Sequence, residues 1–473
     1  MSMMNNYLFS GRHPEYIANE RAWRRSRDAY SGGAAYIDAA LIRHVSEIPV
    51  EFEERRRRAY YFNYPRAIAQ RITQYALAVE PIRRHAVPEL VEDWSRSGLR
   101  TNEVMRQLST LLSVYGRAWL LVDSPGFSGE VSLERVRDER LRPFVRALSP
   151  FSVVNWAAAP DGRLEWAVIA EEAIVNCDPF HYPERRRRRR LYERHHWYLY
   201  EEKSSGIEII ADGANAAGAV PLVPVTEPDG YGLDANHWFE DVVRISEAIL
   251  NNESEAQMNV VKQMFGMLVV SDSFARGAQR AAGRDRAGEG FSATVARSAA
   301  VIESVEEKGI SRYISPSGVE TRMIREENAA LKNELYDVVG LAIQGRSREA
   351  QTAESKSWDF QNTSQFLAAR ADLLEQAELR AWELMHRFDP GIPVPEVVYN
   401  RKFALRDLEK SIQGLLQLST IDAGSGYRRA VNRTAVELVD AINALSAQEK
   451  REIVSEINQT AKEEVRNENQ GTD

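Results

Sequence analysis

The chain has 473 residues, of which 44% are hydrophobic, so it can bury a substantial core in on the order of two to four domains. Its net charge of -8 disfavours a general binder of polyanions, and its single cysteine, Cys177, excludes a disulfide framework or a thiolate-rich metal site. No signal-peptide pattern or long apolar run occurs, so we expect a soluble, unexported protein of a reducing compartment.

Residues 14 to about 113 are predicted to be helical, because apolar residues return every three or four positions. The helical segments are "PEYIANERAWRRSRDAY", "AAYIDAALIRHVS" and one continuous piece, "VEFEERRRRAYYFNYPRAIAQRITQYALAV". Within the last piece, Arg55 to Arg58 alternate with glutamates in the same turns. We interpret them as a solvated, internally paired helix face and not as a binding site.

The pattern changes after Tyr115 to short apolar and alternating runs that indicate strands. A buried strand is expected in "GRAWLLVDSP", and two or three strands follow around the turn signal at residues 160–162. Further strands are expected in "LYERHHWYLYEE", "SGIEIIADG" and "AVPLVPV". The run of six arginines, Arg185 to Arg190, is placed in the turn that precedes one of these strands.

Three long helices dominate the remainder. Residues 236–265 and 319–344 each form a long rod, and two rods of similar length favour an antiparallel pair. A small glycine-rich module with strands lies between them, and a third long helix ends before the prolines of "DPGIPVP". "PEVVYNRKF" is a predicted strand, and the chain is helical again from Leu405.

Catalytic patterns are missing from the sequence. The eight histidines show no metal spacing, and His195 and His196 point to opposite faces of a predicted strand. No phosphate-binding loop and no nucleophile elbow occur, and Cys177 has no local base. We therefore predict no catalytic residues, no metal and no cofactor, and we expect that the protein is not an enzyme.

The order of elements resembles that of the portal proteins of tailed bacteriophages, the head-tail connector rings at one vertex of the capsid. The resemblance covers nearly the whole chain and depends on the order of elements, since no single motif is specific. The segments that carry it are "YYFNYPRAIAQRITQYALAVEPI", "YGRAWLLVDSP", "RPFVRALSPFSVVNWAAAPDGRLEWAVIAEE", "SPSG" and "AESKSWDFQNTSQFLAARADLLEQAE". It implies an α+β fold, mainly α, of portal-type architecture with wing, stem, clip and crown, in which the stem has long helices and the wing has a mixed β region.

Transferred to this chain, the resemblance implies seven segments. They are the wing at 1–235, stem helices at 236–265 and 319–344 with the clip at 266–318 between them, the tunnel loop at 345–353, the long wing helix and wing strand at 354–404, and the crown with the C-terminal tail at 405–473.

The resemblance also implies two functional sites. The tunnel loop that narrows the DNA channel corresponds to Gly345, Arg346, Ser347, Arg348, Glu349, Gln351 and Thr352. Arg346 and Arg348 either contact DNA phosphates or pair with Glu349 and Glu354. In the clip, the docking site for the packaging motor corresponds to Arg276, Arg280, Arg284 and Arg286, for which an exposed, solubilising loop is the alternative.

The implied function is a homo-oligomeric ring, usually of twelve subunits, through which double-stranded DNA is packaged and ejected. Its partners are the terminase large subunit, the major capsid and scaffolding proteins and the head-completion or adaptor proteins, with no membrane. It is located in the virion after assembly in the host cytoplasm. The alternatives are a metal-dependent nucleic-acid-processing enzyme and a helical capsid adaptor or scaffold.

Within the resemblance, Arg185 to Arg190 fall in the part of the wing that faces outward or toward the shell. We expect them to contact other subunits, scaffold or capsid, or to keep the protein soluble, and not to contact translocating DNA. The alternative is that they contact packaged genome on the outer wing surface. That attraction to DNA phosphates would depend on the salt concentration.

Overall fold

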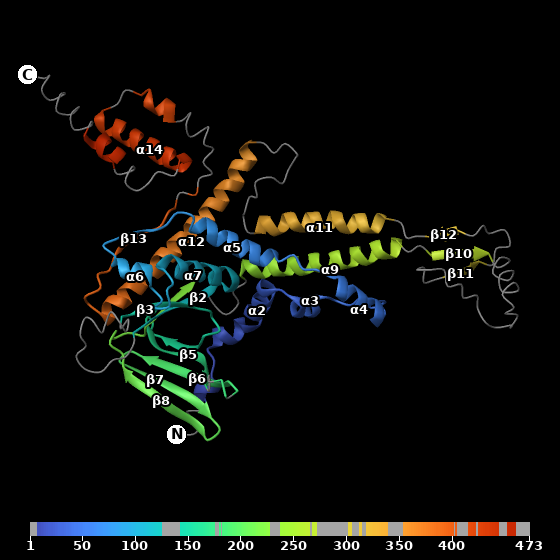
Figure 1. Ribbon diagram of the computed structural model, residues 1–473, viewed down its shortest axis with the longest axis horizontal. Coiled ribbons are helices and arrows are strands. Elements are labelled where there is room, and N and C mark those ends of the chain that lie inside the picture. The colour runs from blue at the N-terminus through green and yellow to red at the C-terminus, as the bar shows by residue number, and fades with distance from the viewer. Residues whose placement is uncertain are drawn as a thin grey trace, which may run out of the picture. The chain divides into compact units, whose positions relative to one another are not determined.

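The protein is an α+β chain, mainly helical, seen here in a computed structural model (Figure 1). The structure describes residues 7–124, 142–175, 179–180, 182–227, 237–264, 267–271, 301–304, 312–314, 318–338, 353–401, 403, 415–421, 424–443 and 452–459. The chain divides into two compact units, Met1–Lys402 and Phe403–Asp473. The described part of the second unit contains helix α14 (Ser425–Asn443) and a helix at 452–459.

The first unit begins with a group of helices, as the sequence predicts, although the segment expected to be helical through Ser46 is helical only as far as Ala40. Their bounds are α2 (Pro14–Ser31), α3 (Ala34–Ala40), α4 (Pro49–Arg58), α5 (Tyr64–Ala76), α6 (Pro88–Glu92) and α7 (Thr101–Tyr115). The expected continuous helix from 50 to 79 is wrong, because α4 and α5 are separate. A new helix starts where the Asn63 side chain accepts a hydrogen bond from the Arg66 N–H and Pro65 occupies the first turn.

Two antiparallel sheets follow, and they confirm the strands expected after Tyr115. One has the order β3-β2-β9 and the other β4-β5-β6-β7-β8. The strands are β2 (Arg117–Asp123), β3 (Phe144–Leu148), β4 (Val153–Ala158), β5 (Leu164–Val175), β6 (Glu184–Glu193), β7 (His196–Lys203), β8 (Gly206–Ala214) and β9 (Leu222–Thr226). The predicted turn at 160–162 separates β4 from β5, with Gly162 at φ 80°.

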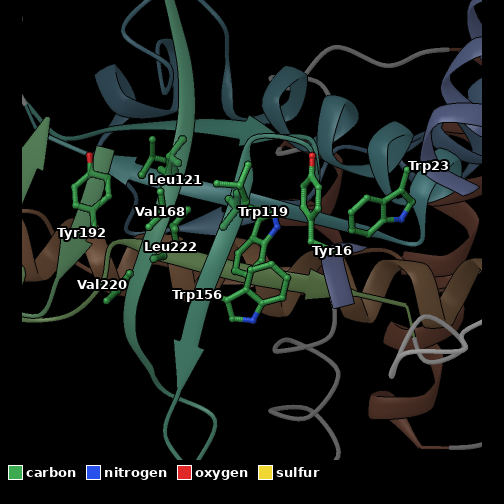
Figure 2. Packing of buried hydrophobic residues seen from close by; sticks show 13 residues of the cluster. Tyr16, Trp23, Trp119, Leu121, Trp156, Val168, Tyr192, Val220 and Leu222 are labelled. Carbon is green, nitrogen blue, oxygen red and sulfur yellow. The ribbon is translucent and has the colours of Figure 1, made fainter. Parts of the chain in front are cut away.

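An aromatic cluster joins α2 to both sheets (Figure 2). Tyr16 and Trp23 of α2 pack edge to face with ring centroids 5.6 Å apart, and Trp119 of β2 packs against Trp156 of β4 at 5.3 Å. The Arg117 guanidinium lies over both of the latter rings, 5.0 and 4.7 Å from their centroids. These contacts fix the start of the helical group on the sheets, because aromatic pairs stabilise beyond the area they bury.

The three predicted long helices are present as α9 (Trp238–Met264), α11 (Val319–Val338) and α12 (Ala353–Phe388). Figure 1 shows α9 and α11 side by side and antiparallel, as the two rods were expected to be. Helix α9 also packs against α2, α4 and α5, so it is shared by the rod pair and the N-terminal helices.

Short strands complete the first unit. The segment between the rods contains β10 (Met267–Ser271), β11 (Val301–Ser304) and β12 (Arg312–Ile314) in the order β11-β10-β12, which confirms the strands expected there. Strand β13 (Glu396–Val398), also expected, pairs with β1 (Ile82–Arg84). Beside this pair, the buried Glu378 of α12 accepts hydrogen bonds from Arg83, Trp382 and Tyr399, at distances between 2.6 and 3.1 Å.

The arginine cluster of α4 only partly matches its expected role. Arg56, Arg57 and Arg58 form the predicted pairs with glutamates of the same helix. Arg55 is instead only 2% exposed and binds Glu47 through two hydrogen bonds of 2.8 and 2.9 Å. A further hydrogen bond of 2.9 Å to Ser254 Oγ attaches α4 to α9, so the interpretation of a wholly solvated face is wrong at this residue.

Replacing Arg55 by alanine is expected to lower the free energy of unfolding by about 3 kcal/mol, because Glu47 loses its partner inside the fold. Arg57→Ala is the matched control from the same helix, since the Arg57 side chain is 71% exposed, and its effect should stay within about 0.5 kcal/mol. Urea denaturation of both variants measures the difference. Equal effects of the two substitutions would contradict the structural role of Arg55.

Candidate functional site

The two sites implied by the resemblance fall outside the described residues. This applies to the tunnel loop, Gly345 to Thr352, and to the clip arginines Arg276, Arg280, Arg284 and Arg286. The structure describes the helices on both sides of the loop, with α11 ending at Val338 and α12 beginning at Ala353. The described features with functional content are the rod pair, the arginine strand and a buried ionic junction at the start of α9.

The rod pair meets along a narrow and partly polar stripe. Among the α11 residues whose burial is described, the buried ones are Thr321, Asn328 and Leu335, which recur every seven positions. Asn252 of α9 donates a hydrogen bond of 3.0 Å to Asn328 Oδ1, and Lys332 lies 3.6 Å from the carboxylate of Glu253. One face of α11 therefore packs on α9.

The other faces of α11 are exposed and charged. Met323 is 63% exposed and Val319 is 55% exposed, although both are apolar. The exposed ionisable residues along the described helix are Glu320, Arg322, Arg325, Glu326, Glu327 and Glu334. Glutamates outnumber arginines in this group by four to two, so the outer surface of the rod is acidic.

The run Arg185 to Arg190 is a strand and not the turn that the sequence led us to expect. It forms most of β6, which lies in the middle of the five-stranded sheet between β5 and β7. In the register, Arg188 stands opposite Glu171 of β5 on one side and Glu201 of β7 on the other. Carboxylates opposite arginines on neighbouring strands offset the repulsion that six adjacent positive charges would otherwise create.

Acidic side chains on both sheet faces bind these arginines. Glu201, a buried residue, accepts hydrogen bonds from Arg186 and Arg188 at 2.9 and 2.8 Å, and these arginines hold the Glu201 pKa below its usual value. Arg190 binds Glu171 at 2.9 Å. On the other face, the ion pairs are Arg185–Glu172 at 3.9 Å and Arg187–Glu202 at 2.9 Å.

The pairing decides what this strand can bind. Five of the six arginines have a carboxylate within 4.0 Å, so their charge is largely compensated inside the sheet. A polyanion would compete with these carboxylates for each guanidinium. The local structure therefore favours a role in sheet stability for most of the run, and Arg189 is the exception.

The two histidines that follow the arginine strand were expected to lie together on one strand, which is wrong for the first of them. His195 lies in the bend between β6 and β7, and only His196 belongs to β7. His196 Nε2 lies 2.9 Å from Asp212 of β8. In the described part of the chain, no three histidine, cysteine or acidic side chains are grouped so that they could hold a metal ion.

A buried ionic junction lies where the sheet, α7, α9 and α12 meet. Glu227, directly after β9, bonds Arg370 of α12 through one carboxylate oxygen. Its other oxygen is 2.9 Å from both His237 Nε2 and the indole nitrogen of Trp238, at the start of α9. Arg370 also donates a hydrogen bond of 2.9 Å to the Ser109 carbonyl of α7.

Burial alone would raise the pKa of Glu227, but Arg370, His237 and Trp238 together lower it to about 2. Gly116 completes the junction: its φ is 69°, and a Cβ there would lie 2.8 Å from the His237 ring. Only glycine combines this backbone conformation with the close approach of the imidazole. No sequence signal predicts this junction, because Glu227 and Arg370 lie 143 positions apart and neither belongs to a recognisable motif.

An open groove of about 960 Å³ lies between α2, α3 and α9. Its floor contains small residues such as Ala22 and Ala39, and its charged residues include Arg25 and Glu247, which bind each other. No helix among the described residues is long and apolar enough to cross a membrane. The groove shows no grouping of residues that suggests a catalytic centre.

No protein-family model and no curated protein matches the chain. Solved structures do. The neck of an empty gene transfer agent (GTA) particle computed with C6 symmetry contains a chain with 13% identity and a TM-score of 0.42, over 83% of this chain and 96% of that one. A chain in the virion of the native GTA particle has 13% identity and a TM-score of 0.43, over 86% of this chain and 98% of that one. A chain in the neck of the native GTA particle computed with C12 symmetry has 13% identity and a TM-score of 0.41, over 83% of this chain and 95% of that one.

The low pKa of Glu227 predicts a specific acid sensitivity. A carboxylate whose pKa is lower in the folded state stabilises the fold above its usual pKa of 4.5, and this contribution disappears as the pH falls toward 2. The shift corresponds to about 3 kcal/mol. Urea denaturation between pH 7 and pH 2 should therefore show a shallower acid loss for Glu227→Gln than for the wild type, together with lower stability at pH 7.

Glu396→Gln is the control for this experiment, because Glu396 pairs with Arg84 at the surface and both side chains are more than half exposed. It should change the free energy of unfolding at pH 7 by no more than about 0.5 kcal/mol. Its loss of stability between pH 7 and pH 2 should match that of the wild type. If the free energy of unfolding of Glu227→Gln falls with pH as steeply as that of the wild type, the acid sensitivity does not come from Glu227.

Proposed function

We propose that this chain is the portal subunit of a tailed phage or phage-like particle. It forms a ring of identical copies, twelve in the expected case, and double-stranded DNA passes through the centre during packaging and ejection. The observation that carries the proposal is the rod pair of α9 and α11, followed by the 36-residue helix α12, in the order expected from the sequence resemblance.

The exposure of α11 supports a ring. A single stripe around Thr321, Asn328 and Leu335 packs on α9, while apolar Met323 and Val319 are left in solvent. A rod with one partner and several uncovered faces is satisfied when copies pack side by side. Repeating one such contact by rotation closes a ring, because a head-to-tail interface forms a ring wherever the rotation closes.

The acidic outer surface of α11 supports a channel through which DNA slides. Each firm contact between arginine and phosphate would retain the duplex, whereas glutamates repel it. The excess of glutamate over arginine on the described helix therefore suits a passage better than a binding surface. In this proposal the few positive contacts come from the tunnel loop, and the chain itself carries out no catalysis.

The remaining parts of the proposal follow the sequence resemblance. The clip docks the terminase large subunit during packaging and head-completion or adaptor proteins afterwards. The wing contacts the major capsid and scaffolding proteins, and the ring nucleates capsid assembly in the host cytoplasm before it becomes part of the virion.

Negative-stain electron microscopy of the purified full chain tests the proposal. Rings with a central hole are expected, and co-expression with capsid and scaffolding proteins is the condition to use if the isolated chain does not assemble. A chain that stays monomeric in both conditions and cleaves DNA in the presence of magnesium would reject the portal and favour a metal-dependent nuclease. A monomer that only binds capsid proteins would favour an adaptor.

The tunnel-loop assignment has its own test. Replacing Arg346 and Arg348 by alanine is expected to leave ring formation intact and to change the rate or the retained length of packaged DNA, because the loop loses its contacts to phosphate. The double variant Arg57→Ala, Arg58→Ala removes two surface arginines from α4 and is the matched control. Unchanged packaging by the loop variant would remove both arginines from the mechanism.

A further inference from the structure

Arg189 differs from the other buried arginines of the described residues. Its residue surface is 5% exposed, yet its hydrogen bonds go only to backbone oxygens. Arg55, Arg83 and Arg370 have similarly buried side chains, and each of them binds a carboxylate. A buried charge without an opposite charge is costly, so Arg189 stands at a place where an anionic partner would stabilise the fold.

The geometry of the guanidinium indicates what kind of group is missing. Nη1 of Arg189 donates to the Arg188 carbonyl at 2.9 Å, Nη2 makes a long contact of 3.5 Å to the Phe9 carbonyl, and Nε has no hydrogen-bond partner. The edge formed by Nε and Nη2 is the one through which Arg55 and Arg83 bind carboxylates. In Arg189 this edge is available for two parallel hydrogen bonds.

Two more guanidinium groups lie close to Phe9, which stacks on Arg189. Arg12 donates a hydrogen bond of 3.0 Å to the Phe9 carbonyl, and the Arg187 guanidinium lies 5.9 Å from the centroid of the Phe9 ring. Glu202, which pairs with Arg187, is the nearby carboxylate. Burial, Arg12 and Arg187 lower the pKa of Arg189 to about 10, which indicates uncompensated positive charge around it.

A single N-terminal turn covers the cluster. Phe9 belongs to the helical turn at residues 7–10, is 4% exposed, and stacks on Arg189 with 5.0 Å between the guanidinium carbon and the ring centroid. Within the turn, the Gly11 N–H donates a hydrogen bond of 2.6 Å to the Tyr7 carbonyl, and Tyr7 itself is 65% exposed. Beyond its own hydrogen bond, the turn is held by Phe9 on the Arg187 and Arg189 guanidinium groups and by Leu8 on the aromatic cluster, so an anionic partner of Arg189 has to displace these contacts.

We propose that Arg189, assisted by Arg12 and Arg187, binds a carboxylate side chain from an acidic segment of another protein, which replaces the Phe9 turn over the guanidinium. Nucleic acid fits the place less well. A duplex presents rows of phosphates and needs an open basic surface, whereas this is one narrow fork beside Glu202. The inference goes beyond the proposed function, since it requires neither a channel nor a ring.

The full chain and a fluorescein-labelled hexaglutamate peptide provide the test, with binding measured by fluorescence anisotropy at low salt. Wild type should bind the peptide saturably, and Arg189→Gln should weaken the binding by at least about tenfold, the loss expected for a paired guanidinium and carboxylate. Arg189→Lys should weaken it as well, because lysine keeps the charge but lacks the fork. Phe9→Ala should strengthen the binding by removing the cover.

Arg185→Gln is the matched control, since it removes one positive charge from the same strand at a side chain that is 78% exposed. It should leave peptide affinity unchanged, and an equal loss in this variant would mean that only general charge is sensed. Thermal unfolding adds a second readout: Arg189→Gln should melt no lower than wild type, because it removes an uncompensated charge. Arg190→Gln should melt lower, because it leaves Glu171 without its partner.

Besides an equal loss of affinity in Arg185→Gln, three results would overturn the proposal. The first is that the wild type does not bind the peptide saturably. The second is that a short DNA duplex binds more tightly than the peptide and loses its affinity in Arg189→Gln. The third is a clearly lower melting temperature for Arg189→Gln, which would make the residue purely structural. Peptide binding is measured on the isolated chain in any oligomeric state. Its failure is therefore distinct from a failure to form rings.

Discussion

The buried pair of Glu227 and Arg370 is the contact on which the arrangement of the first unit depends. It gathers four elements at one point: the end of β9, the start of α9 through His237, the last turns of α7 through Ser109, and α12. Taking both charges out of water costs several kcal/mol for each ion, and the additional hydrogen bonds offset that cost only in this geometry. The positions of α9 and α12 at the end of β9 are thereby fixed, because separating them there would leave a buried charge unpaired.

Buried charged side chains also join other distant segments among the described residues. Arg83 and Glu378 hold β1 against α12 by an ion pair, and Arg55, which pairs with Glu47, holds α4 against α9 through a hydrogen bond to Ser254. Such pairs contribute little net stability compared with apolar packing, but they penalise every arrangement that separates them. In a protein proposed to assemble side by side with its copies, fixed positions of the long helices would let each subunit present the same surface to the next. The arginine strand follows the same rule, with Glu201 inside the sheet between two guanidinium groups.

Much of the secondary structure could be predicted. The long helices have the expected starts and ends within a few residues where the structure describes them, because the periodicity of apolar residues and the stop at "DPGIPVP" are local signals. The break between α4 and α5 was missed although Asn63 and Pro65 signal it, since the apolar period continues across it. The tunnel loop and the clip arginines stay predictions, as they lie outside the described residues.

The order and length of the elements follow from local signals, because helix periods and turn residues act over a few positions. The state of each charge depends on contacts between segments that are distant in the chain. Six arginines in a row look identical in the sequence, yet their surroundings differ. The Arg185 side chain is exposed, Arg188 forms an ion pair with Glu201, and Arg189 is buried without a carboxylate partner. The reason is that strand register brings the acidic partners from other strands, and no local pattern specifies which carboxylate will stand opposite which arginine.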